Sequence, residues 1–301
     1  GCKTALQDGG MKPARSFLIF IFSSFIFLWS CGSLGSGLHP VSMGGRYGYI
    51  DRSGKLAIQP LFEDAGEFAN GLAPAKTGGK WGFIDTKGTF AIAPQFDLAD
   101  PFSSDGLAMV GLGGKLGFVK KGGQYAINPT FDGTGQFGDG LAPVAVGGRW
   151  GYINQTGGMA INPQFDEASS FSEGMAAVRI GDAHGYIDKS GKLAINPQYR
   201  VAGDFHDGRA AVKLGDRFGY IGRDGKTVIA PQFDGAGDFS DGLALVVLGK
   251  RFGYIGKSGK FEINPQFDNA GSFQGGLAPV WVNGRQGYVN KEGKFVYNPS
   301  A

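Results

Sequence analysis

Three histidines are the side chains of this sequence best suited to proton transfer or metal binding: His39, His184 and His206. Imidazole is a common metal ligand and changes charge near neutral pH. No two of them have the His-x-x-x-His spacing of a metal site, and none is paired with a glutamate at a metal-binding spacing. His184 and His206 each replace the residue that other copies of a repeated pattern carry there, so each is a substitution in a single copy. A three-histidine site assembled across copies stays open as an alternative, but we expect no metal site.

Acidic residues form a more regular series, with one in most copies of the pattern. The series is Glu63, Asp97, Asp132, Asp166, Asp234 and Asp268, and Arg200 interrupts it. One interpretation is a ring of carboxylates that binds Ca²⁺ or basic groups. The other is a turn or cap residue that accepts hydrogen bonds from nearby backbone N–H groups. Arg200 would damage a ligand ring but would only weaken one turn, so we expect the second.

Motifs of the common enzyme classes are missing from the sequence. Two carboxylates for glycoside hydrolysis would have to stand out from the repeated pattern, and none does. The glycine pairs Gly113-Gly114 and Gly147-Gly148 precede predicted strands, whereas a phosphate-binding loop opens a helix. No Gly-x-Ser-x-Gly nucleophile elbow is present. We therefore expect no catalytic residue, no enzymatic activity and no cofactor.

The elements that would position any site repeat along the chain. A glycine followed by an aromatic residue recurs at steps of 34 residues, with a single step of 35, at Gly48, Gly82, Gly117, Gly151, Gly185, Gly219, Gly253 and Gly287. Self-similarity at such a period indicates a tandem-repeat architecture, in which each unit cannot bury its apolar face alone. The sequence therefore predicts eight units of about 34 residues.

One unit, residues 140–163, shows the expected local structure. Short β-prone runs cover 141–146, 150–154 and 159–161, and glycine-bearing turns or Asn162-Pro163 separate and end them. This pattern is typical of a three-stranded antiparallel meander. Pro163 has no N–H to donate, so the third strand ends there or lies at a sheet edge. Between meanders we expect a compact connector loop, with room for a helical turn, held by two aromatics six residues apart, such as Phe165 and Phe171.

Side-chain alternation in the middle strand predicts how units pack. Trp81 and Phe83 point to one face and Gly82 and Ile84 to the other, so both faces are apolar and both must be covered. We expect neighbouring meanders to stack face to face, with the glycine leaving room for an aromatic of the next unit. Two all-β architectures satisfy this: a β-propeller-like ring, which we favour, and an open β-superhelix. No strand exchange that would close a ring is evident.

The beginning of the sequence resembles an export signal. The first methionine is Met11, and residues 1–10 are interpreted as upstream, non-native sequence. Residues 11–30 have a basic start and an apolar stretch of 13 residues, which is short for a membrane span and suits a signal peptide. Leu28-Trp29-Ser30-Cys31-Gly32 resembles a bacterial lipobox, which implies lipidation of Cys31 and a tether over residues 31–37. Ordinary cleavage to a secreted protein, or an uncleaved anchor, remains the alternative.

Charge and cysteine content argue against a nucleic-acid-binding protein and against a disulfide-stabilised one. The whole chain carries a net charge of +3, and the segment before Cys31 contributes three basic residues and one acidic residue, which leaves about +1. No basic patch is present, so we expect no nucleic-acid partner. Because no cysteine follows Cys31, packing alone must stabilise residues 38–301.

The pairs Trp81-Gly82 and Trp150-Gly151 resemble the WG-repeat family, also described as KWG repeats. The wider pattern is G-[KR]-[WF]-G-[YF]-I-[DN], followed by G-K, I-N-P-Q-F-[DE], F-x-x-G and L-A, and it covers residues 38–301. Other residues fill the tryptophan position in six units: Tyr47, Leu116, His184, Phe218, Phe252 and Gln286. The resemblance implies a bacterial all-β repeat protein, often in the cell envelope, with no defined enzymatic activity.

Together these observations favour a lipid-anchored envelope protein that acts as a binding scaffold. We expect its partner to be an envelope protein or a cell-wall polysaccharide, and its attachment to the membrane to be the lipid. Binding residues should be those that differ between units in turns and connectors. The alternatives are a carbohydrate-binding, lectin-like module and a hydrolase built on a repeat scaffold.

Overall fold

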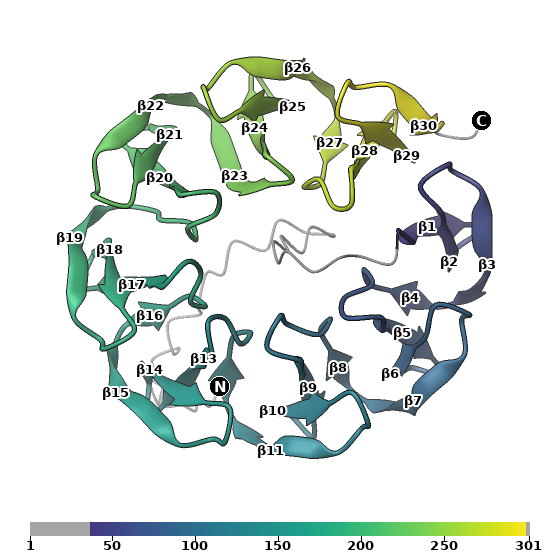
Figure 1. Cartoon of the computed structure of the whole chain (residues 1–301), viewed down its shortest axis with the longest axis horizontal. Coiled ribbons are helices and arrows are strands. Elements are labelled where there is room, and N and C mark those ends of the chain that lie inside the picture. Colours follow the sequence, from purple (N-terminus) through teal and green to yellow (C-terminus); the bar gives the residue numbers. More distant parts are fainter. Residues whose placement is uncertain (1–36, 299–301) are drawn as a thin grey trace, which may run out of the picture.

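The computed structural model describes residues 37–298, which form strands and turns without any helix. Eight small antiparallel sheets, called blades 1 to 8 in chain order, stand in a ring around a central axis (Figure 1). The protein is an eight-bladed β-propeller, so the predicted ring is confirmed and the open superhelix is not formed. Within residues 37–298, no helix of the length and apolarity needed to cross a bilayer is present.

The strands of the first four blades are short and evenly spaced. They are, in blade 1, β1 (His39–Met43), β2 (Arg46–Ile50) and β3 (Leu56–Phe62); in blade 2, β4 (Asp64–Ala65), β5 (Ala73–Thr77), β6 (Lys80–Ile84) and β7 (Phe90–Phe96); in blade 3, β8 (Leu98–Ala99), β9 (Leu107–Leu112), β10 (Lys115–Lys120) and β11 (Tyr125–Phe131); and in blade 4, β12 (Gly133–Thr134), β13 (Leu141–Val146), β14 (Arg149–Asn154) and β15 (Met159–Phe165).

The last four blades repeat this order. They contain, in blade 5, β16 (Glu167–Ala168), β17 (Met175–Ile180), β18 (Ala183–Asp188) and β19 (Leu193–Tyr199); in blade 6, β20 (Arg209–Leu214), β21 (Arg217–Gly222) and β22 (Thr227–Phe233); in blade 7, β23 (Gly235–Ser240), β24 (Leu243–Leu248), β25 (Arg251–Gly256) and β26 (Phe261–Phe267); and in blade 8, β27 (Asn269–Ala270), β28 (Leu277–Val282), β29 (Arg285–Asn290) and β30 (Phe295–Tyr297).

Turn chemistry sets the hairpins of each blade, as blade 4 shows. Gly147 and Gly148, between β13 and β14, have φ values of 58° and 78°. These left-handed conformations suit a two-residue hairpin turn and carry no steric cost for glycine. At the other end of β14, Asn154 Oδ1 accepts hydrogen bonds from the N–H groups of Thr156 (3.0 Å) and Gly158 (2.9 Å). The sequence-predicted turns are therefore confirmed.

The predicted connector differs from the observed one. In six of the eight blades a fourth, two- to six-residue strand precedes the three predicted strands. In blade 4, for example, Gly133 and Thr134 pair with Ala145 and Val144 of β13. No helical turn forms in any described connector, because the connector backbone finds its partners on the neighbouring strand edge. Blades 1 and 6 have three strands in the described part of the chain.

The proline of each unit lies in the outermost strand. Blade 4 has the strand order β12-β13-β14-β15, so Pro163 of β15 is at a sheet edge, which was one of the two expected outcomes. The predicted end of the strand at Asn162-Pro163 is wrong. The strand continues past it to Phe165, with register shifts between Trp150↔Phe165 and Tyr152↔Ile161. Such shifts accommodate the missing donor and bend the outer strand. Figure 1 places β11, β15 and their counterparts at the circumference and the connectors toward the centre.

The repeated glycine has a different role from the predicted one. A Cβ atom at Gly151 would lie 2.5 Å from the carbonyl oxygen of Ile161 and 2.7 Å from the nitrogen of Pro163. Both atoms belong to β15 of the same blade. The glycine therefore lets the irregular outer strand approach its own middle strand, and it does not make room for an aromatic of the next blade.

Neighbouring blades share their hydrophobic cores, as predicted. One cluster combines Tyr152 and Phe165 of blade 4 with Phe171 of the next connector and Val178 of blade 5. The Tyr152 and Phe171 rings lie 4.8 Å apart, and Tyr152 Oη donates a 2.8 Å hydrogen bond to the Ser169 carbonyl. Each fully buried large side chain contributes on the order of 2 kcal/mol to folding. The blade interfaces therefore hold the ring together.

The last interface joins the two ends of the described chain. Val41 and Ile50 of blade 1 form a buried cluster with Leu277 and Tyr288 of blade 8. Strands of the two blades do not mix, because β1 to β3 and β27 to β30 form separate sheets. The ring therefore closes through side-chain packing, consistent with the lack of a strand-exchange signal in the sequence.

Candidate functional site

The repeated acidic series links neighbouring blades. Asp97 accepts a 2.8 Å hydrogen bond from Gly113 N–H in the β9–β10 turn and pairs with Lys80 Nζ at 2.5 Å. Equivalent ion pairs join Lys115 to Asp132, Arg149 to Asp166, Arg217 to Asp234, and Arg251 to Asp268. Asp166, Asp234 and Asp268 also accept from a backbone N–H of the next blade, Glu63 accepts from two such groups without an ion pair, and the contact given for Asp132 is the Lys115 ion pair. This agrees with the backbone-capping interpretation, although the capped turn belongs to the next blade.

The three histidines lie in separate places. His39 Nδ1 is 3.6 Å from Glu67 Oε2, and its ring is 5.6 Å from that of Tyr288 at the ring closure. His184 Nε2 is 3.5 Å from Glu167 Oε2. Among residues 37–298, the group of metal-ligating side chains that comes together contains just one histidine, His206. The alternative three-histidine site is therefore wrong.

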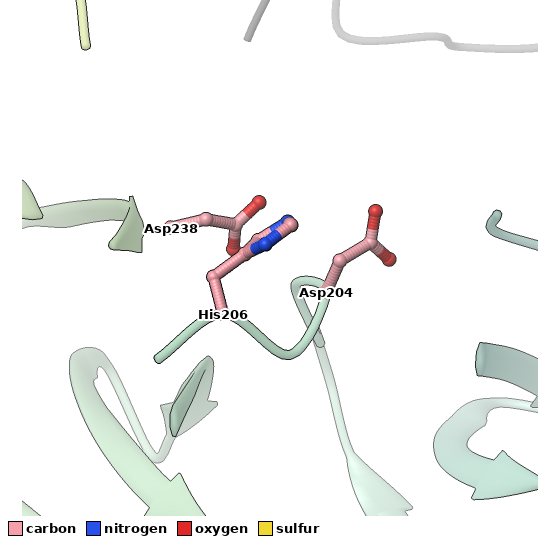
Figure 2. A group of neighbouring side chains, drawn as sticks. All are labelled: Asp204, His206 and Asp238. Atoms are coloured by element: carbon pink, nitrogen blue, oxygen red, sulfur yellow. The ribbon is translucent and has the colours of Figure 1, made fainter. Parts of the chain in front are cut away.

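Asp204, His206 and Asp238 form this group, called the inner triad below (Figure 2). One ligand atom from each lies within 4.8 Å of the others. Asp204 and His206 belong to the connector before β20, and Asp238 belongs to β23 of the next blade. Asp204 and Asp238 occupy the same position of consecutive units, 34 residues apart, immediately before the connector phenylalanine.

The connector backbone is shaped to bring these side chains together. Gly203 N–H donates to the Ala211 carbonyl (2.8 Å) and His206 N–H to the Arg209 carbonyl (2.8 Å), so the segment folds back on β20. A Cβ atom at residue 203 would lie 2.6 Å from Asp238 Oδ1. Gly203 therefore lets the Asp238 carboxylate lie close to the connector, and a side chain at residue 203 would displace it.

Burial dominates the electrostatics of the inner triad. It raises the pKa of Asp204, and the Ser169 hydroxyl opposes that rise. Burial raises the pKa of Asp238 as well, the neighbouring Asp204 carboxylate raises it further, and the Asp204 backbone N–H opposes both. Burial lowers the pKa of His206 and outweighs the nearby acidic residues. The triad therefore favours a neutral imidazole beside two carboxyl groups that resist being charged together.

Ser172 fixes the tautomer of His206. Ser172 Oγ donates its single proton to the Phe205 carbonyl at 2.6 Å and lies 3.3 Å from His206 Nδ1. Since this hydroxyl has no second proton, it accepts from Nδ1–H, and the imidazole lone pair is then on Nε2. A neutral histidine in this tautomer can bind a metal ion through Nε2.

A second buried carboxylate belongs to the connector of blade 3. Asp100 is 6% exposed, and its Oδ2 accepts a 3.0 Å hydrogen bond from Gln136 Nε2. Burial raises the pKa of Asp100 to about 6, against the effect of the Gln136 hydrogen bond. The connectors of consecutive blades thus contact each other through unit-specific polar residues.

Some of the expected site residues lie in the described part of the chain and others do not. Cys31, the predicted lipidation site, and the predicted signal peptide lie outside the described residues. His206 was predicted to be a unit-specific residue, but its proximity to Asp204 and Asp238 was not predicted. The signal was present as an aspartate at the same connector position in two consecutive units. Other units carry Glu67, Pro101, Gln136, Ser170 and Ser272 there.

Comparison with known proteins identifies the repeat. The family described as "WG containing repeat" matches residues 47–81, 81–115, 117–150, 150–182, 185–217, 218–251 and 252–285. The chain belongs to the WG-repeat family. No curated protein matches this WG-repeat chain.

Solved structures share the propeller fold with this WG-repeat protein. The dihydro-haem d1 dehydrogenase NirN matches with a TM-score of 0.55 and 14% identity over 86% of this chain and 72% of that one. A eukaryotic initiation factor matches with a TM-score of 0.52 and 10% identity over 88% and 85% of the two chains. The extracellular domain of the hybrid two-component system BT4673 from B. thetaiotaomicron matches with a TM-score of 0.52 and 9% identity over 88% of this chain. The WG-repeat chain spans 44% of that domain, and identities this low show the fold alone.

Proposed function

We propose that this WG-repeat protein is a lipid-anchored binding scaffold of the bacterial cell envelope and has no catalytic activity. The observation that carries the proposal is that the repeated residues serve to build the fold. The aromatics that define the repeat, such as Tyr152 and Phe171, are buried between blades, and the repeated carboxylates cap turns. A frame built this way leaves its unit-specific residues for recognition.

The proposed attachment rests on the sequence before the propeller. Cys31 follows a basic and apolar segment and the Leu28-Trp29-Ser30 sequence of a lipobox-like motif. A diacylglycerol group with an additional acyl chain gives stable anchoring, which a single chain does not. Residues 31–37 would then tether the propeller to the membrane surface, on the outer-membrane or periplasmic side or at the cell surface.

The proposed partner is an envelope protein or a cell-wall polysaccharide. The connectors and turns differ between units, so the ring presents a non-repeating surface on a repeating frame. Propellers bind partners of many kinds with such loops, and fold alone therefore does not choose between the two. A lectin-like module and a repeat-scaffold hydrolase are the competing functions that the same surface would serve.

Binding measurements on the full lipoprotein in detergent test the proposal. We expect saturable binding to one of two probes, a purified cell-wall polysaccharide or solubilised envelope proteins coupled to a surface. A thermally unfolded sample is the control, since a folded scaffold is required for specific binding. Binding confined to soluble oligosaccharides and lost when exposed aromatics are replaced would favour the lectin. Turnover of chromogenic glycosides or esters would overturn the non-catalytic proposal.

A further inference from the structure

We propose that Asp204, His206 and Asp238 form a binding site for one divalent transition-metal ion, Zn²⁺ or Mn²⁺. Their ligand atoms lie within 4.8 Å of one another, and Figure 2 shows the His206 ring beside the Asp238 carboxylate, with Asp204 to one side of them. A tetrahedral ion bonded to nitrogen and oxygen at about 2.0–2.2 Å places its ligand atoms about 3.3–3.6 Å apart. Small side-chain rotations therefore suffice to close the triad around an ion.

The two carboxylates of the triad have no lysine or arginine partner in residues 37–298, although the Ser169 hydroxyl donates to Asp204 and the Asp204 backbone N–H donates to Asp238. Asp97 and Asp166 pair with a lysine and an arginine, whereas no ion pair in residues 37–298 involves Asp204 or Asp238. Asp204 Oδ1 is buried and accepts no hydrogen bond within that part of the chain. Buried carboxylates are stabilised by paired charges or by metal ions. A cation between the two would satisfy the unpartnered oxygen and remove their mutual repulsion.

The imidazole is prepared for the same role. His206 Nδ1 faces the Ser172 hydroxyl, which places the lone pair on Nε2. Metal-bound histidines commonly donate their other N–H to an oxygen acceptor, which fixes the ring and its tautomer. Ser172, in the connector of the preceding blade, would be that acceptor. Gly203 completes the arrangement, because any side chain there would meet the Asp238 carboxylate.

The donor set selects the class of ion. One imidazole nitrogen and two carboxylate oxygens suit Zn²⁺ and Mn²⁺, whereas Ca²⁺ takes six to eight oxygen ligands and Mg²⁺ keeps several waters. Residues 37–298 contain no cysteine, so this described part of the chain supplies no thiolate ligand. Three protein ligands leave at least one coordination position for water or a group from a partner. The site would also join the connector of blade 6 to β23 of blade 7.

Calorimetric titration of the metal-depleted, full-length protein in detergent tests this site. We expect Zn²⁺ or Mn²⁺ to bind with one ion per chain and Ca²⁺ and Mg²⁺ to bind at least tenfold more weakly. His206→Ala and Asp238→Asn should each lower the affinity at least tenfold. His184→Gln is the matched control, because His184 lies near a single carboxylate, that of Glu167. Its affinity should equal that of the wild type.

Two further measurements keep the result interpretable. Circular dichroism checks that each variant is folded, and the visible spectrum of wild-type protein loaded with Co²⁺ reports directly on nitrogen and oxygen ligation. Gly203→Ala leaves all three ligands in place but displaces the Asp238 carboxylate, so it should also weaken binding. Absence of saturable binding to the wild type would overturn the proposal. So would unchanged affinity in folded His206→Ala and Asp238→Asn. The proposed scaffold function does not depend on either result.

Discussion

The Tyr288 hydroxyl donates a 2.5 Å hydrogen bond to the Pro40 carbonyl, 248 residues earlier in the chain. In most other blades the corresponding tyrosine reaches a carbonyl of the next connector, 17 residues later, as Tyr254 does with Gly271 at 2.7 Å. Blade 1 therefore follows blade 8 in space much as each blade follows the one before it. The circle is completed by a tyrosine hydroxyl, as at most other interfaces, but here the acceptor is a carbonyl of strand β1.

Tyr288→Phe tests this closing contact. Removing the hydroxyl leaves the buried ring in place but deprives the Pro40 carbonyl of its donor. We expect the free energy of unfolding to fall by about 1–2 kcal/mol. Chemical denaturation monitored by circular dichroism measures the change. Tyr254→Phe, at an interior interface, is the matched control and should lose a similar amount; no change in either variant would contradict the role assigned to the hydroxyl.

Gly151→Ala tests the approach of the outer strand to the middle strand. The added methyl group would lie 2.5 Å from the Ile161 carbonyl oxygen, so β15 must move away from β14. Overpacking of this kind costs about 1–3 kcal/mol and lowers the melting temperature. Gly158→Ala in the same blade is the control, since its methyl group would meet only the Asn154 side chain, at 3.2 Å. Equal stability of Gly151→Ala and the wild type would refute the steric explanation.

Asp100→Asn tests the cost of a buried charge. Burial raises the folded-state pKa of Asp100 to about 6, so the folded protein holds this proton more tightly than the unfolded chain does. The contribution of Asp100 to the free energy of unfolding is therefore fully present below about pH 4 and is lost as the pH rises through about 6. We expect Asp100→Asn to raise the free energy of unfolding by about 2 kcal/mol at pH 7.5.

The same substitution should change stability little at pH 4, where both folded forms are neutral at this position. Asparagine keeps an oxygen that can accept from Gln136 Nε2, so the hydrogen bond survives. Denaturation curves at the two pH values measure the difference between the variant and the wild type. A benefit equal at both pH values would mean that packing, and not charge, is responsible.

Cys31→Ser tests the proposed lipid anchor. Without the thiol no diacylglycerol can be attached, so the protein should leave the membrane fraction and lose incorporation of labelled palmitate. Membrane fractionation and metabolic labelling measure both outcomes. Ser33→Ala, in the proposed tether, is the control and should stay lipidated. Retention of Cys31→Ser in the membrane fraction would show that another segment anchors the protein.

Many features of this propeller could be predicted from short-range sequence patterns. The turn at Gly147-Gly148, the edge position of Pro163 and the sharing of cores between units were all predicted, because alternation, turn residues and period act over a few residues to one repeat. The connector was predicted less well. Its short strand depends on a free edge of the next sheet, and a sequence of two residues such as Gly133-Thr134 carries no strand pattern of its own.

The tertiary structure decided the relationships that run between blades. Whether eight units form a ring or a spiral depends on a small rotation between neighbours that accumulates over all of them, and no single residue encodes it. The inner triad depends on that rotation as well, since it brings Asp238 to the connector that holds Asp204 and His206. The sequence determined which side chains each unit carries and at which positions, because the order of residues along the chain fixes both. Only the packing angle between blades determined which of those groups meet.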